Sequence, residues 1–498
     1  MSQLRSLAGQ TAIYGVSSIL GRVLNYALVP LHTYVFMREE MGQVAYLYAY
    51  VAFFLITYTF GMETTFFRFT TKEKDDNYYH YTGSVVLVIS AFFTFLLLFA
   101  NQSIAQIIGY PDSGLFIKWL AIILFLDAIT AIPFAKLRIE NKAKVFALAK
   151  MMAITVNVVL QLIFLILLPK IADREIFQFA EPIVTNYFDA EFGIGYIFLS
   201  NLISSLIIVP LLWKQISQFR FRFDFEIFKS MMKYAIPIFI TGLAGIGIEQ
   251  IDKILIEHVL PANFYSSMNS AQALGVYSQT LKLSIFMSLA IQAFRYAGEP
   301  FFFSQAESEN SPQLFSRIMH YFVLFCIIIF VVISTNVDLI GLIFLRNPEY
   351  RVALYLVPLL LFGKLLWGIY VNLSIWFKLT DKTIYGTYFN LVGAGVTILC
   401  NLALLPIIGL DGSAIAMIIS YLVMCLMCFY IGRKHFPIPY NFMPILGYLT
   451  SAVLIVYISF EIQFNNLRID SLFNFGIAFA YTLAVFLIEK KNLKTKST

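Results

Sequence analysis

Charged residues are scarce in this sequence. Only 13% of its 498 residues are Asp, Glu, Lys or Arg, whereas soluble domains average roughly 25%. Apolar residues make up 59% of the chain, more than a soluble fold of this length would bury. The apolar residues form long runs bounded by Pro, Gly and charges. The composition therefore excludes a soluble protein and predicts an all-α polytopic membrane protein.

Residues for covalent or metal chemistry are also few. The four cysteines all lie in apolar runs, so no disulfide framework is expected. Cys425 and Cys428 have a metal-site spacing, but no second pair or histidine is near them, which favours core packing. The sequence has no phosphate-binding loop and no catalytic constellation, so we expect no metal, no cofactor and no enzymatic activity. A net charge of only +6 gives no reason to expect nucleic acid as a partner.

The apolar runs are long enough to cross a membrane many times. A spanning helix needs roughly 20 mostly apolar residues, and cutting the chain at its polar punctuation gives about fourteen candidates. They lie at about 9–36, 41–67, 80–101, 115–136, 145–168, 191–213, 231–258, 271–303, 315–343, 351–378, 384–406, 411–432, 442–463 and 470–489. Because fourteen is even, both termini lie on the same side.

The basic residues indicate which side that is. Of 35 Lys and Arg residues, seven fall in predicted outer loops and five within spans, which leaves 23 at the inner side. Cytoplasmic loops carry such an excess of positive charge. We therefore expect both termini to be cytoplasmic and the chain to be retained as a multi-pass protein.

A weak internal repeat indicates the domain organisation. The fifth predicted span ends with Leu168-Pro169, and the eleventh ends with Leu405-Pro406. A similar segment that begins with glycine follows each of these Leu-Pro pairs. A six-helix unit used twice predicts a lobe at 1–222 and a lobe at 223–435, with two further helices and a basic tail at 436–498. An acidic, aromatic insertion at about 170–190 is expected on the outer side, as a short helix, a hairpin or a packed loop.

Five cations lie within predicted spans, where each costs about 2.5–3.5 kcal/mol unless it meets water or a counter-ion. They are Arg22, Lys253, Lys282, Arg295 and Lys364. No acidic residue lies within one turn of Arg22, Lys282 or Lys364, which favours a functional role for these three.

Other polar residues share helix faces with these cations. Asn25 lies on the face of Arg22, and Gln292 and Glu299 lie on the face of Arg295. Glu249 precedes Lys253 by four residues, the favourable order for an ion pair. Structural ion pairs are the alternative interpretation for these groups.

Asp127 is central in the fourth span. It is a counter-ion to Arg22, an ion-coupling carboxylate or a tie between helices, and the sequence does not distinguish these roles. A cavity with surplus positive charge favours an anionic ligand such as a phosphate, since Arg and Lys both bind phosphate oxygens.

Three segments resemble a known group of proteins. They are the opening segment 9–33, which contains Ser-Ser-Ile-Leu-Gly-Arg-Val-Leu-Asn-Tyr, then Tyr234-Ala-Ile-Pro-Ile followed by Ile251-Asp-Lys-Ile-Leu-Ile, and Leu274-Gly-Val-Tyr-Ser-Gln-Thr-Leu-Lys-Leu. They resemble the polysaccharide (O-antigen) flippases of the multidrug/oligosaccharidyl-lipid/polysaccharide exporter superfamily, and the resemblance extends over the whole chain.

The resemblance implies two six-helix lobes in a pseudo-two-fold V around a central cavity, plus two C-terminal helices. It also implies that an undecaprenyl-pyrophosphate-linked oligosaccharide crosses the bacterial inner membrane by alternating access. In related lipid II flippases, basic residues of the first and eighth helices line the cavity and bind the pyrophosphate. Arg22, Lys282 and Arg295 match them by type and approximate position. We add Lys364 to the expected pyrophosphate site because it is central in the tenth predicted span. Membrane lipids and the polysaccharide polymerase machinery are the other expected partners.

Other functions remain open at this stage. A lipid II flippase shares the fold and the charge pattern, and a drug or cation exporter belongs to the same superfamily. An integral-membrane glycosyltransferase, polymerase or ligase is a different class, for which the outer insertion is small. A membrane scaffold would not explain the buried cations.

Overall fold

The computed structural model describes residue 15 and residues 19–495, with gaps at 307, 309, 463 and 465. Within these residues the named elements are all helical, which confirms the all-α prediction. The chain divides into two compact units, Met1–Ile254 and Leu255–Thr498, and the helix α12 (Phe225–Val259) runs across the division. The lobe boundaries expected from the sequence stay a prediction.

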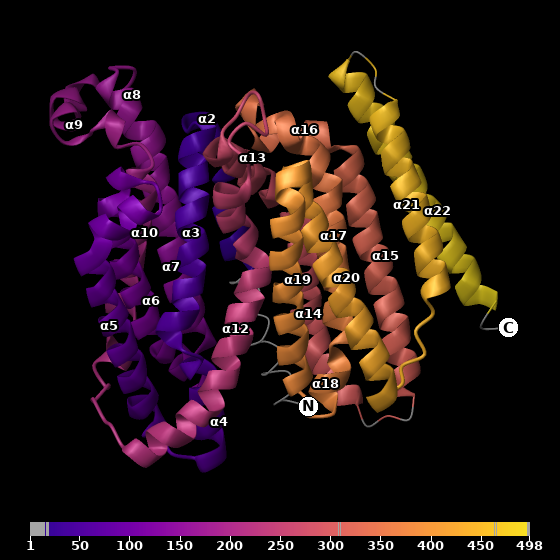
Figure 1. Cartoon of the computed structure of the whole chain (residues 1–498), viewed down its shortest axis with the longest axis horizontal. Coiled ribbons are helices and arrows are strands. Elements are labelled where there is room, and N and C mark those ends of the chain that lie inside the picture. Colours follow the sequence, from indigo (N-terminus) through magenta and orange to yellow (C-terminus); the bar gives the residue numbers. More distant parts are fainter. Residues whose placement is uncertain are drawn as a thin grey trace. The chain divides into compact units, whose positions relative to one another are not determined.

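The first unit contains helices α2 to α11 and most of α12 (Figure 1). Its elements are α2 (Val29–Val35), α3 (Arg38–Thr59), α4 (Met62–Glu73), α5 (Tyr78–Ile107), η1 (Pro111–Ser113), α6 (Gly114–Ile139), α7 (Ala143–Leu162), η2 (Ile163–Leu167), α8 (Leu168–Ala172), η3 (Gln178–Ala180), α9 (Glu181–Tyr187), η4 (Ala190–Phe192), α10 (Gly195–Leu211) and α11 (Trp213–Ile216). The predicted outer insertion therefore holds short helices, of which α9 is the longest.

The second unit contains the remaining helices. They are α13 (Ser270–Lys282), α14 (Ile285–Gln305), α15 (Ser311–Thr335), α16 (Val337–Phe344), η5 (Pro348–Leu356), α17 (Val357–Leu373), α18 (Ile375–Leu379), α19 (Ile384–Ile408), α20 (Leu410–His435), α21 (Phe442–Glu461) and α22 (Leu467–Thr495). Both α21 and α22 lie along α15 (Figure 1).

Eleven helices of the described residues are long and apolar enough to cross a membrane. A twelfth span is formed if α13 and α14 are taken together, since they meet at a bend of 47°. Helix α10 is apolar but shorter, and the first predicted span, 9–36, is described only at residue 15 and from residue 19 onward. The structure thus confirms a polytopic membrane protein, whereas the count of fourteen stays a prediction.

The second predicted span is broken where α3 meets α4. Phe60 and Gly61 both adopt left-handed backbone conformations, with φ of 48° and 68°. A Cβ atom on Gly61 would lie 3.1 Å from Ile238 and 3.2 Å from the carbonyl oxygen of Ala235. Glycine is therefore required here both for its positive φ and for the close approach of α12.

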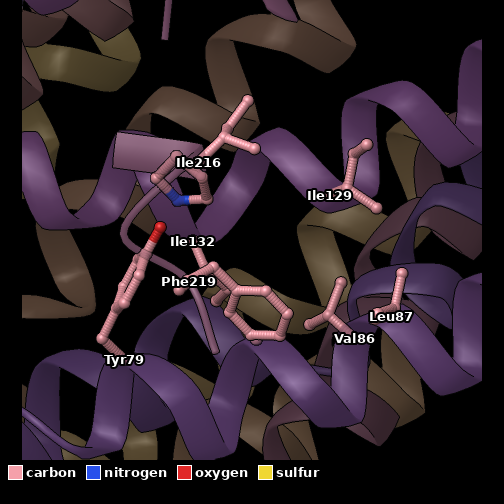
Figure 2. Close-up of a pocket in the computed structure, with 9 residues that line it drawn as sticks. Tyr79, Val86, Leu87, Ile129, Ile132, Ile216 and Phe219 are labelled. Carbon is pink, nitrogen blue, oxygen red and sulfur yellow. The ribbon is translucent and has the colours of Figure 1, made fainter. Parts of the chain in front are cut away.

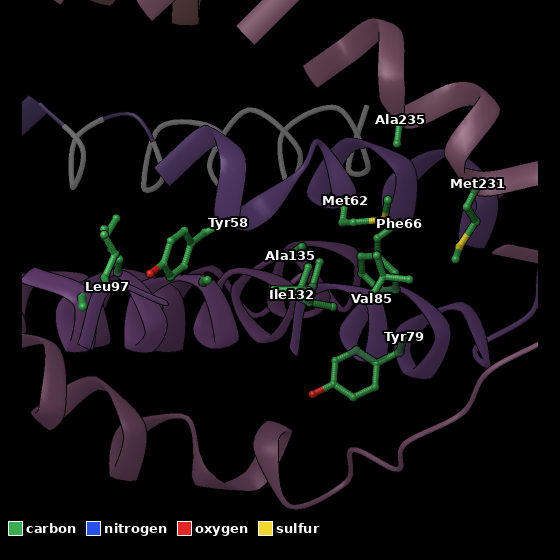
Figure 3. Packing of buried hydrophobic residues seen from close by; sticks show 14 residues of the cluster. Tyr58, Met62, Phe66, Tyr79, Val85, Leu97, Ile132, Ala135, Met231 and Ala235 are labelled. Carbon is green, nitrogen blue, oxygen red and sulfur yellow. The ribbon is translucent and has the colours of Figure 1, made fainter. Parts of the chain in front are cut away.

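The core of the first unit lies where α3, α4, α5, α6 and α12 meet. Figure 3 shows Met62 and Phe66 of α4 pointing toward Ile132 of α6, with Met231 of α12 beside them. All of these side chains are buried. In contrast, large apolar side chains such as Phe99 and Met443 are about four-fifths exposed, as expected where lipid takes the place of a protein neighbour.

Asp338 provides a test by pH. It lies at the start of α16, beyond the span that ends at Thr335, and partial burial together with the Asp470 carboxylate raises its pKa. A carboxyl whose pKa is raised by folding destabilises the protein above that pKa, and the penalty disappears as the pH falls through it.

We therefore expect Asp338→Asn to raise the melting temperature at pH 8, and the gain to shrink toward pH 4. Thermal unfolding in detergent over this pH range measures the difference. A gain of the same size at both pH values would contradict the assignment to titration of Asp338.

Candidate functional site

Arg22 and Asn25 lie on the short helical stretch at 19–26, and both side chains are exposed. Tyr26, one turn after Arg22, lies within electrostatic range of both Arg22 and Glu249 of α12. An exposed arginine in a membrane-crossing segment must meet water or a counter-charge, because contact with lipid alone is too costly. Arg22 therefore lies near a wetted, partly acidic region of the first unit.

Asp127 of α6 contacts residues from two other helices. Ser205 Oγ of α10 donates a hydrogen bond to Asp127 Oδ1 at 3.2 Å. The charge of Lys150 on α7 also acts on Asp127, and its Nζ lies 4.3 Å from the centre of the Phe134 ring. The carboxyl thus ties α6 to α10, with Lys150 rather than Arg22 as its basic neighbour among the described residues.

The acidic and basic groups of α12 pair differently from the sequence expectation. Lys253 Nζ donates to the backbone carbonyl of Glu249 at 3.0 Å and lies 3.4 Å from Asp252 Oδ1. Asp252 is buried, and the Lys253 side chain is only 12% exposed. The carboxylate that partners Lys253 is therefore that of Asp252, which leaves the Glu249 carboxylate available to the region near Tyr26.

One face of α14 carries a cluster of charged side chains in the second unit. Arg295 Nε lies 3.7 Å from Glu299 Oε1, and Lys378 Nζ of α18 approaches the same oxygen at 2.6 Å. Gln292 Nε2 donates to the hydroxyl of Tyr296 at 3.3 Å on this face. Two cations thus share one carboxylate, so the cluster keeps a net positive charge, and the Arg295 side chain is 47% exposed.

The two remaining predicted cations have different surroundings. Lys282 is the last residue of α13, at the bend before α14. Lys364 of α17 lies with Nζ 5.8 Å from the centre of the Trp367 ring. Cations over aromatic faces gain electrostatic stabilisation that depends on how far they are desolvated.

The predicted site residues fall into two sets, one in each unit. The set in the first unit is Arg22, Asn25, Asp127, Glu249 and Lys253, and the set in the second is Lys282, Gln292, Arg295, Glu299 and Lys364. Within the second set, the structure brings Arg295 and Glu299 together as predicted.

Sequence reasoning missed several polar partners. His32 Nε2 and Gln161 Oε1 are 2.6 Å apart, and Gln161 Nε2 donates to Asn157 Oδ1 at 3.1 Å. This buried chain joins α2 to α7. Asn157 and Gln161 recur at a spacing of four in an apolar run, a signal that would have identified a polar helix face.

A small pocket in the first unit does not fit a charged ligand. It has a volume of about 130 Å³ and is lined largely by apolar side chains of α5, α6 and the stretch after α10, among them Tyr79, Ile132 and Phe219 (Figure 2). The Tyr79 hydroxyl is satisfied by donating to the Gln215 carbonyl at 2.7 Å. Because no predicted site residue lines this pocket, we do not assign it to the candidate site.

No group of three or more His, Cys, Asp or Glu side chains in the described part of the chain is arranged to hold a metal ion. The candidate site is therefore described by its charges and hydrogen bonds alone.

The bond between Ser205 and Asp127 can be tested by mutation. We expect Ser205→Ala to lower the free energy of unfolding by about 1–2 kcal/mol, because a buried carboxyl loses a hydrogen-bond donor. Thermal unfolding of the purified protein measures this loss. Ser217→Ala is the control, since that hydroxyl forms only a long, exposed bond of 3.4 Å to Lys214; equal losses in the two variants would contradict the role of Ser205.

Comparison with known proteins shows which folds and families this chain resembles. Residues 35–170 match the model of a family described as polysaccharide biosynthesis protein. A structure of the lipid II flippase MurJ in an inward closed conformation superposes with a TM-score of 0.73 at 14% identity, covering 97% of this chain and 99% of that one. Among curated proteins, none matches the sequence.

Transporters of the MATE family, which belongs to the MOP superfamily, have the same fold. One in an inward-facing conformation gives a TM-score of 0.60 at 14% identity, over 83% of this chain and 94% of that one. One in an outward-facing conformation gives 0.56 at 15% identity, over 86% and 95%. The fold that the resemblance implied is thus confirmed.

Proposed function

We propose that this protein is a flippase that moves an undecaprenyl-pyrophosphate-linked oligosaccharide from the cytoplasmic to the outer leaflet of the bacterial inner membrane. The match of residues 35–170 to a polysaccharide biosynthesis family supports the substrate class. The fold shared with a lipid II flippase over 97% of the chain supports the reaction. In this proposal the protein is a transporter and catalyses no covalent step.

The observation that carries the proposal is the unbalanced charge on α14. Arg295 and Lys378 share the single carboxylate of Glu299, and Arg295 remains half exposed. A guanidinium in this state has donors left for a phosphate group, which it can bind through two parallel hydrogen bonds. A pyrophosphate carries enough negative charge to compensate more than one such cation.

We assign the pyrophosphate to Arg22, Lys282, Arg295 and Lys364. Asn25, Asp127, Glu249, Lys253, Gln292 and Glu299 are proposed to line the transport path or to couple it to an ion. The two six-helix lobes would alternate in access while the prenyl chain stays in lipid, with both termini in the cytoplasm. Membrane lipids and the polysaccharide polymerase machinery are the proposed partners.

Native mass spectrometry of the gently purified protein tests the cargo. We expect a co-purifying polyprenyl-pyrophosphate saccharide that is lost in Arg22→Ala. Recovery of bulk phospholipid alone would refute the assignment of the cargo, although the fold would be unaffected.

A lipid II flippase is the second candidate, favoured by the extent of the fold match with MurJ. Expression in a strain that lacks its own lipid II flippase separates the two proposals. Growth would support lipid II as the cargo, and failure to grow with intact, membrane-inserted protein would support the oligosaccharide. A drug exporter would instead give drug resistance that survives neutralisation of the cations.

A further inference from the structure

A polar cavity of about 630 Å³ lies in the second unit, away from the residues assigned to the cargo. It is bounded by the start of α15, the segment that leads into α21, and the end of α22. Its polar lining includes Ser316, Arg317, His320, Asn441, Glu489 and Asn492. His320 follows Arg317 by three residues and Ser316 by four, so its side chain neighbours each of them on the surface of α15. The volume is within the range of ligand sites, roughly 300–1,000 Å³.

The carboxylate of this cavity already has three partners within the protein. Glu489 Oε2 lies 3.2 Å from His320 Nε2. Its Oε1 accepts hydrogen bonds from the Tyr448 hydroxyl at 2.7 Å and from Asn492 Nδ2 at 3.4 Å. These bonds also fasten α22 to α15 and α21, and they leave Glu489 with little capacity for a further cation.

Arg317 has no carboxylate partner in the described part of the chain. Its side chain is exposed at the cavity, and no carboxylate of the described chain lies within 4.0 Å of it. Glu489 is the acidic residue in the cavity lining, and its carboxylate lies against His320 rather than Arg317. Among the described residues, the cavity therefore offers the guanidinium of Arg317, together with the amide of Asn441, to an anion.

Exposed apolar side chains follow two of the lining residues along their helices. Tyr321, which also lines it, is followed one turn deeper along α15 by Phe325, which is 54% exposed. Ile445 of α21 lines the cavity, and the neighbouring Leu446 is 53% exposed. An occupant with an anionic group at Arg317 would thus have an apolar track for a hydrocarbon chain.

We propose that this cavity binds the phosphodiester headgroup of a glycerophospholipid, with the phosphate on Arg317 and the acyl chains along α15 and α21. The cavity lies at the end of the unit that the positive-inside pattern assigns to the cytoplasm, and basic pockets between membrane helices on that side bind anionic headgroups. The site is independent of the proposed transport function, because none of its residues belongs to the cargo set.

Native mass spectrometry of the full-length protein in detergent tests this site, with dioleoyl phosphatidylglycerol as the probe. We expect retention of the lipid to fall about tenfold in Arg317→Gln, which removes a charge-assisted hydrogen bond. Arg433→Gln is the matched control, because Arg433 is an exposed arginine at the end of α20 that does not line the cavity.

A second variant and a soluble probe complete the test. Gln313→Trp fills the cavity from its rim without removing charge, and it is expected to lower retention as well. Glycerol phosphate at millimolar concentration should not displace the lipid. Equal retention by wild type and both variants would overturn the proposal, and displacement by glycerol phosphate would show that the site takes a free phosphate instead of a lipid.

Discussion

Replacing both Arg22 and Arg295 by glutamine is expected to abolish translocation while the protein still folds. In the proposed mechanism each arginine would give the cargo a charge-assisted contact of about 1.5–3 kcal/mol. Losing both should reduce transport by a factor on the order of 10² or more, and each single variant by roughly tenfold. Flux of a lipid-linked saccharide into proteoliposomes measures this effect.

Folding should survive because neither arginine holds a buried partner. Arg22 is exposed, and Glu299 keeps Lys378 at 2.6 Å when Arg295 is removed. The control pair is Arg433→Gln with Arg468→Gln, two exposed arginines outside the candidate site. Arg→Lys at both site positions should restore part of the flux, since lysine retains the charge without the planar fork. Wild-type flux in the double glutamine variant would refute the assignment.

Gly412→Val is expected to cause the largest loss of stability. A Cβ atom on Gly412 would lie 2.7 Å from the carbonyl carbon of Leu404 and 2.9 Å from its oxygen. These are backbone atoms, so the contact cannot be relieved by rotating a side chain. We expect a loss of about 3 kcal/mol or more in the free energy of unfolding.

The reason is the close approach of α19 and α20. Small and hydroxyl-bearing residues line their contact: Ser413 Oγ donates to Asn401 Oδ1 at 2.7 Å, and Ser420 Oγ donates to the Gly393 carbonyl at 2.8 Å. Small residues permit such approach between membrane helices. A valine at 412 would separate the helices and break these bonds.

Fluorescence-detected size exclusion and thermal unfolding measure the effect of this substitution. Gly395→Val is the control, because a Cβ atom on Gly395 of α19 would meet nothing within 4 Å. If the two valine variants proved equally stable, close packing of α19 on α20 could not be what Gly412 provides.

The fold was largely predictable because lipid imposes a simple requirement on sequence. Runs of some 20 apolar residues must be helical to satisfy their backbone groups, and their ends were marked by charges. Breaks within runs were harder to predict. The left-handed turn at Phe60 and Gly61 has no polar marker, and Lys282 at the second bend was interpreted as a cation within a continuous span.

The candidate site was predictable in its residues and not in its partners. A charge inside a span is conspicuous because of its cost, so Arg295 and Asp127 were identified. Their partners come from distant parts of the chain: Lys378 for Glu299 and Ser205 for Asp127 are each separated by nearly 80 residues. Helical spacing reveals only neighbours on the same helix, and it favoured Glu249 over the adjacent Asp252 for Lys253.

The attachment of the last two helices has a consequence for biosynthesis. Among the described elements, α21 and α22 find their main partner in α15 rather than in each other. Helices of a membrane protein insert first and associate afterwards. The C-terminal pair therefore gains most of its packing from α15, although the Tyr481 hydroxyl also donates to the Tyr448 carbonyl between the two helices. It completes its packing only on a scaffold that was already in the bilayer, so its docking reports that the rest of the unit has been built correctly.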